Sequence, residues 1–125
     1  MVRLVIGRQG ESGLGFDLPE VLKALGPRVL ASAWAIDGLH YVSTDERNVS
    51  GFQAEEGVRI PGAKLLSGIS NLLQVLDGEF RAFEASREPW VIVRAIDSSW
   101  WEVESDDSVA LSAIRERFRN VDEQS

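Results

Sequence analysis

The stretch LQVLDGEFRAFEASREPWVIVRAIDSSWWEVE at residues 73–104 decides the fold. Short apolar runs are separated here by the turn-forming pairs Asp77-Gly78 and Asp97-Ser98. An Asp-Gly pair between apolar runs is a strong hairpin signal, because both central residues of the tightest turn need a positive φ. We therefore expect consecutive hairpins, with residues 90–96, apolar on both faces, as a central strand.

The same turn chemistry occurs upstream, where residues 29–42 hold two apolar runs on either side of Asp37-Gly38. This pattern predicts another hairpin. Its register would place Trp34 opposite Tyr41, an aromatic pair that contributes about 0.5–1 kcal/mol beyond burial.

Three segments have apolar residues at helical spacing together with residues that begin helices. The first starts at a capping box formed by Asp17 and Glu20. The second covers residues 61–72. The third covers residues 106–118, and Ser105 is expected to cap it.

These elements predict an α+β fold with a mainly antiparallel sheet of five to seven strands, built from consecutive hairpins, and about three helices packed on one face. No composition break divides the chain, so residues 1–125 are expected to form one domain. Within it, residues 1–16 are expected to be a mobile strand and glycine-rich loop, and residues 122–125 a frayed tail.

Composition and charge exclude several functions. The 125 residues include no Cys, which excludes disulfides, thiolate metal sites and a Cys nucleophile. The net charge of −7 has the wrong sign for nucleic-acid binding and favours a basic protein partner. No apolar run approaches the roughly 20 residues of a membrane helix, and no signal peptide is recognisable. A cytoplasmic, bacterial protein without membrane contact is the expectation.

No motif indicates catalysis. His40 is the only histidine, and no serine lies in a nucleophile elbow. Asp37, Asp77 and Asp97 are each explained by turns. We therefore predict no catalytic residue, no metal site and no cofactor, and favour a binding protein over an enzyme.

The tandem tryptophans Trp100 and Trp101 give the sharpest functional hypothesis. Neighbours on a strand point to opposite faces, so if Trp101 is buried in the core, Trp100 lies on the other face among acidic side chains. The alternative is that both tryptophans are buried, with Trp100 beneath a loop or helix. An exposed aromatic with acidic neighbours suits a basic protein surface. The predicted partner-binding residues are Trp100, Glu102, Glu104, Asp106 and Asp107, with a second acidic patch at Asp45, Glu46, Glu55 and Glu56.

The leading hypothesis is a small acidic protein-binding domain without catalytic activity. Its size, charge and lack of Cys are similar to those of immunity proteins and antitoxins that inhibit basic toxins. One alternative is a small-ligand-binding domain or minor enzyme with a pocket between sheet and helices, lined by Trp34, His40, Tyr41 and Trp90. Another alternative is a homodimeric interaction protein whose acidic charge serves only solubility.

Overall fold

The computed structural model describes residues 1–10, 15–43, 58–70 and 72–124. The strands are β1 (Val2–Ile6), β2 (Ala33–Ser43), β3 (Arg59–Pro61), β4 (Leu72–Phe83), β5 (Val91–Ile96), β6 (Trp100–Ser105) and β7 (Val121–Gln124). The helices are α1 (Leu18–Leu25), α2 (Gly62–Ile69), α3 (Ser108–Arg117) and a short 3-10 turn, η1 (Pro27–Val29).

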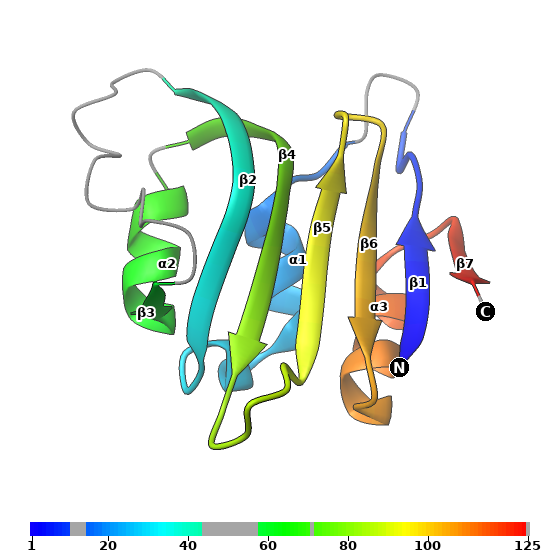
Figure 1. Ribbon diagram of the computed structural model, residues 1–125. Coiled ribbons are helices and arrows are strands. Elements are labelled where there is room, and N and C mark those ends of the chain that lie inside the picture. The colour runs from blue at the N-terminus through cyan, green and yellow to red at the C-terminus, as the bar shows by residue number, and fades with distance from the viewer. Residues whose placement is uncertain (11–14, 44–57, 71, 125) are drawn as a thin grey trace.

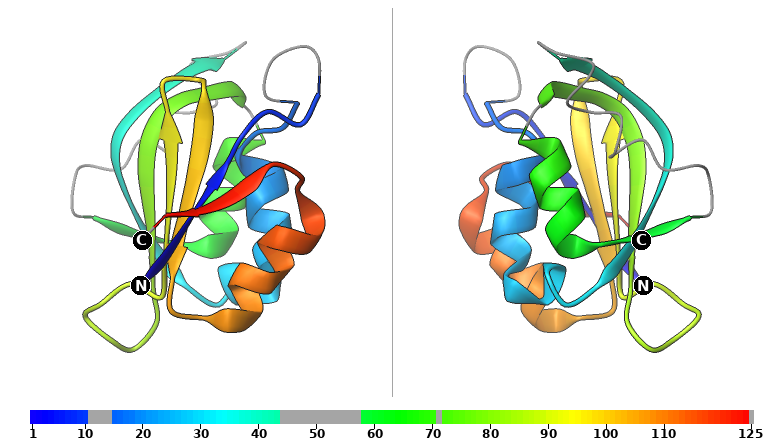
Figure 2. Two further views of the ribbon diagram at one scale, coloured as in Figure 1. Left: turned by 90° about the vertical axis from the view of Figure 1, so that its right-hand side faces the viewer. Right: turned by 90° about the vertical axis from the view of Figure 1, so that its left-hand side faces the viewer.

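The strands of the described residues form one antiparallel sheet in the order β3-β2-β4-β5-β6-β1-β7 (Figure 1). The three α-helices lie on one face of this sheet, and the other face carries no helix of the described residues (Figure 2). This arrangement confirms the predicted α+β fold with its antiparallel sheet. The central strand is β5, as its apolar sequence predicts.

The core lies between the sheet and the helices, and the alternation of side chains along each strand builds it. On β6, Trp101 and Val103 are almost fully buried, whereas Trp100 on the other face is 38% exposed. The helices bury their apolar stripes against this face, including Leu22 of α1 and Ile114 of α3. Burial of this kind is the main favourable contribution to folding.

The two predicted Asp-Gly hairpins are wrong. Asp37-Gly38 lies inside the continuous strand β2, and Asp77-Gly78 lies inside β4. The two strands pair with each other, and the register shifts between Asp37 and His40, so the glycines mark an irregularity where the long strands bend. Gly38 has a φ of 64°, so the positive φ that the pair favours is present, but it serves a bulge and not a turn.

This pairing also changes the predicted aromatic contact. Trp34 lies opposite Ala82, and Tyr41 lies opposite Val75, so the two rings do not face each other. Strand β2 pairs with β4 from Ala33 opposite Phe83 to Ser43 opposite Leu72, and β4 also pairs with β5 through Gly78, so long-range strand pairing overrides the local turn preference.

The Asp97-Ser98 turn is confirmed. Both residues have positive φ, 48° and 57°, and β5 and β6 pair from Ile96 and Trp100 onward. The Asp77 carboxylate accepts a hydrogen bond of 2.8 Å from the Asp97 amide, so β4 holds this turn in place.

The first helix is capped as predicted. The Asp17 side chain accepts from the backbone of α1, and the Glu20 carboxylate accepts from the Asp17 amide at 2.9 Å. Asp17 also accepts from the Val75 amide at 3.1 Å, which joins α1 to β4. For α3 the predicted cap is wrong: Asp107 caps the helix, and Ser105 ends β6.

Both ends of the chain differ from expectation. Strand β1 lies between β6 and β7, and the expected tail forms most of β7. The predicted glycine-rich loop lies partly outside the described residues, at 11–14. Among the helices that the structure describes, none has the length and apolar character needed to cross a membrane.

Candidate functional site

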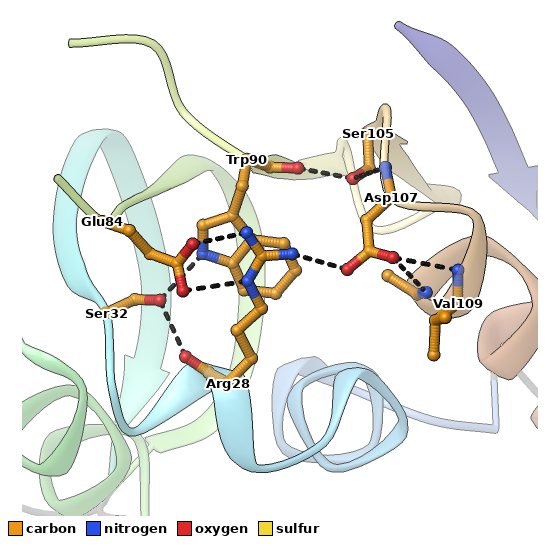
Figure 3. Close-up of polar contacts among 8 residues, drawn as sticks. Arg28, Ser32, Glu84, Trp90, Ser105, Asp107 and Val109 are labelled. Carbon is orange, nitrogen blue, oxygen red and sulfur yellow. Dashed lines mark hydrogen bonds and ion pairs between the residues drawn. The ribbon is translucent and has the colours of Figure 1, made fainter. Parts of the chain in front are cut away.

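Three segments that are distant in sequence meet at one end of the sheet. They are η1, which carries Arg28; the connection from β4 to β5, which carries Glu84 and Trp90; and the junction of β6 with α3, which carries Asp107 (Figure 3). Asp107 is placed there because it caps α3, and its carboxylate accepts from the Val109 amide at 2.9 Å.

Arg28 lies at the centre of this cluster. Its Nη1 donates to Asp107 Oδ2 at 2.6 Å, and its Nε donates to Glu84 Oε2 at 3.0 Å. A further bond joins Nη2 to Glu84 Oε1, so the guanidinium binds that carboxylate through two atoms. The guanidinium carbon also lies 4.1 Å from the centre of the Trp90 ring, a cation–π contact.

Two buried serines hold Trp90 in position. The indole Nε1 donates to Ser32 Oγ at 2.8 Å, and Ser32 Oγ donates to the Arg28 carbonyl at 2.7 Å. Ser105 Oγ donates to the Trp90 carbonyl and accepts from the Asp107 amide at 3.0 Å. The cluster is therefore a connected network that ties η1, β5 and α3 together.

A cavity of about 450 Å³ opens beside this network. We call it the acidic cleft, and it is lined by Arg28, Glu84, Ser86, Glu88, Pro89, Trp90, Asp106 and Asp107. Four carboxylates therefore surround it, against one guanidinium. Asp106 also forms an ion pair of 3.2 Å with the Met1 ammonium, but its side chain is 79% exposed.

The chemistry of the cleft suits an organic cation better than a metal ion. Within the part of the chain that the structure describes, no three His, Asp or Glu side chains are grouped so that they could hold a metal. Pro89 and Trp90 add an apolar wall that would contact the alkyl stem of a lysine or arginine side chain.

The contacts of Arg28 lower the pKa of both of its acidic partners. The hydrogen bond from Arg28 lowers the pKa of Glu84. Burial opposes ionisation of Asp107, but hydrogen bonds from the Ala110 and Val109 amides and from Arg28 outweigh it and lower the pKa of that carboxyl. Both groups thus release their protons more readily in the folded protein than in the unfolded chain.

This pKa difference predicts acid sensitivity with a defined sign. A carboxyl with a lowered folded-state pKa contributes stability above its unfolded pKa, and that contribution is lost as the pH falls through the folded value. The window therefore begins near pH 5 and extends below about pH 4. We expect Arg28→Gln to unfold at a lower urea concentration than wild type at pH 7, by a small margin because the pairs are partly exposed.

Urea unfolding at a series of pH values checks this expectation. As the pH falls from about 5 through the lowered folded-state pKa values, the difference between wild type and Arg28→Gln should shrink, since the carboxyls then take up protons. Arg115→Gln is the matched control, because Arg115 pairs with the exposed Glu123 at 3.7 Å. A difference between wild type and Arg28→Gln that is constant from pH 7 to pH 3 would contradict the assignment.

The structure divides the predicted partner-binding residues into separate places. Trp100 lies at the start of β6, and Asp106 follows its end, about 20 Å away for a strand rise of about 3.3 Å per residue. Asp106 and Asp107 line the acidic cleft, whereas Trp100 does not. The second predicted patch, Asp45, Glu46, Glu55 and Glu56, lies outside the described residues.

Trp100 is partly exposed on the face opposite Trp101, which the hypothesis of a contact surface requires, but its acidic neighbours are paired. Its Nε1 donates to Glu102 Oε2 at 3.0 Å. Glu102 and Glu104 contact Arg94 at 3.7 and 3.1 Å, and Arg3 lies 3.9 Å from Glu102. These acids therefore do not form an uncompensated negative surface.

The pairing continues across the helix-free face of the sheet. Arg94 contacts Glu79 at 2.9 Å, Arg81 contacts Glu79 at 3.8 Å, and Arg81 contacts Asp37 at 2.5 Å. Charges of opposite sign thus alternate from β6 to β2. This face is close to neutral, and the excess negative charge of the described residues must be presented elsewhere, in part at the acidic cleft.

The four residues predicted to line a ligand pocket are not brought together. Trp34 is fully buried, and its Nε1 donates to the Val29 carbonyl at 3.0 Å. Trp90 lies at the acidic cleft, whereas His40 is exposed beyond the β2 bulge and Tyr41 is half-buried there.

Sequence reasoning missed Arg28, Glu84 and Glu88. Glu84 and Glu88 lie in the connection between β4 and β5, close in sequence to Trp90, and this local grouping was an available signal. Arg28 had no such signal, because it is 56 residues from Glu84 and 79 from Asp107.

No family model matches the chain, and no curated protein or solved structure is significantly similar to it.

Proposed function

We propose that this domain binds a basic protein without catalysing a reaction, and that the acidic cleft receives a lysine or arginine side chain of that partner. The observation that supports this function is the gathering of Glu84, Glu88, Asp106 and Asp107 around one cavity beside Trp90.

The charges of the cleft differ in availability. Arg28 offsets one of the two negative charges of Glu84 and Asp107 and keeps both carboxylates in position. Glu88 and Asp106 are exposed at the rim, where an incoming cation can reach them. Arg28 and its partners would therefore form a rigid wall, and the rim acids would supply attraction and a faster encounter.

The chemical class of the partner follows from this arrangement. A cationic protein with a protruding Lys or Arg fits, and a basic nuclease of the kind that immunity proteins inhibit is one example. Such a role would place the protein in the bacterial cytoplasm. Trp100 and the paired acids of β6 would then lie outside the main contact.

Titration calorimetry with an arginine-containing basic peptide tests the cleft. We expect binding at low salt that weakens strongly as salt is added, because rim charges are screened. The double variant Glu88→Gln/Asp106→Asn should weaken binding about five- to ten-fold, the effect of losing two partly exposed ion pairs. Its fold should be unchanged, because neither residue is buried.

The matched control is Glu116→Gln/Asp122→Asn, which removes the same charge at exposed positions outside the cleft. This variant should bind nearly as well as wild type. Equal weakening in both double variants would show that the peptide responds to net charge alone and would refute the cleft as the binding site.

A further inference from the structure

A second cavity lies on the helical side of the molecule, away from the acidic cleft. It is a groove of about 470 Å³ between α2 and the end of α1 with η1. Leu22, Val29 and Ile69 are almost fully buried and form its floor, and Leu30 and Leu66 form its walls. Leu30 is 54% exposed, so part of the apolar lining of the groove faces solvent.

The groove has few polar lining residues, and the charged one is a lysine. Among the described residues that line it, only Ser70 and Lys23 have polar side chains, and Lys23 is exposed in the last turn of α1. Within the described residues, Lys23 forms no ion pair. The groove thus combines an apolar interior with one uncompensated positive charge, in a protein whose net charge is −7.

A neighbouring cavity extends this positive region. It shares Pro19 and Lys23 with the groove and adds Arg117 and Glu20. The Glu20 carboxylate accepts from the Asp17 amide in the α1 cap. Arg117 lies 5.1 Å from the Phe118 ring and forms no ion pair with the residues described. Two cations against one acid give this neighbouring cavity an excess of one positive charge.

We infer that this groove binds a small amphipathic carboxylate, with its hydrocarbon chain between α1 and α2 and its carboxylate at Lys23. The volume lies within the range of small-molecule sites. Charge complementarity selects the head group: an anion gains from Lys23 and Arg117, whereas a cation would be repelled. This site is independent of the acidic cleft, which has the opposite charge.

Titration calorimetry with sodium decanoate, below its micelle concentration, tests the site. We expect saturable binding at one decanoate per chain, and much weaker binding of decyltrimethylammonium, which has the same tail and the opposite charge. Lys23→Glu should weaken decanoate binding about five-fold. Lys64→Glu is the matched control and should bind as wild type, because Lys64 is exposed on α2 but does not line the groove.

Leu30→Glu tests the apolar wall separately. Because Leu30 is largely exposed, the variant should fold, and decanoate binding should be lost. The inference is overturned if decanoate does not saturate, if both alkyl ions bind equally, or if the two lysine variants behave alike. It is also overturned if sedimentation shows a dimer that Leu30→Glu dissociates, because a second chain would then cover the groove.

Discussion

Trp101→Ala is expected to lower the free energy of unfolding by about 3–5 kcal/mol, whereas Trp100→Ala should lower it by no more than about 1 kcal/mol. The two residues are neighbours of the same type, so intrinsic strand preference is the same for both. Only their faces differ: Trp101 is 1% exposed and Trp100 is 38% exposed.

The physical reason lies in what surrounds each indole. Trp101 pairs with Ile6 and Ala95 on the two flanking strands, and its ring centre lies 6.3 Å from that of Phe16. Removing it leaves a large cavity that the close-packed core closes only in part. Trp100→Ala removes a hydrogen bond from the indole to Glu102 at the surface, where water replaces it.

Urea unfolding followed by far-ultraviolet circular dichroism gives both values without depending on indole fluorescence. A loss of 3–5 kcal/mol is a large fraction of the stability of a domain of this size, so Trp101→Ala should unfold at a clearly lower urea concentration. Similar losses for the two variants would contradict the assignment of Trp101 to the core and of Trp100 to the surface.

Gly62→Ala is expected to lower the free energy of unfolding by about 3 kcal/mol, even though helix preference alone predicts a gain. Gly62 is the first residue of α2, and its amide donates to the Ser32 carbonyl at 2.9 Å. A β-carbon there would lie 2.1 Å from the Val29 carbonyl oxygen and 2.9 Å from Leu30 Cα. Both atoms belong to the backbone, one to the last residue of η1 and one to the residue that follows it, so α2 or η1 must move to make room for the β-carbon.

The same unfolding measurement on Gly10→Ala provides the control. A β-carbon at Gly10 would meet no atom within 4 Å, and its backbone does not require a positive φ. This variant should be neutral or slightly stabilising, because alanine restricts the unfolded chain. Equal stability of Gly62→Ala and Gly10→Ala would contradict the close approach of α2 to η1, and with it the position of Val29 at the floor of the groove.

The two proposed sites depend on this same packing. Segment η1 supplies Arg28 to the acidic cleft and Val29 to the floor of the groove, and Gly62 allows α2 to approach it. A variant that displaces η1 should therefore affect both cavities. The charge variants proposed for each site leave η1 in place, which keeps tests of function separate from tests of stability.

The sequence by itself determined the features that depend on residues close together in the chain. The Asp17–Glu20 capping box, the alternation that exposes Trp100 and buries Trp101, and the Asp97-Ser98 turn all follow from hydrogen bonds or spacing within a few residues. The antiparallel α+β class followed from these patterns together, because each apolar face has to be covered.

Tertiary structure alone decided which strands pair and which side chains meet. Asp37-Gly38 became part of a bulge in β2, and Asp77-Gly78 became an interior part of β4, because both strands continue past these pairs and pair with each other. The acidic cleft required Arg28, Glu84 and Asp107 to converge from three distant segments. Local sequence carries no signal for such convergence, since it depends on how all the buried faces fit together at once.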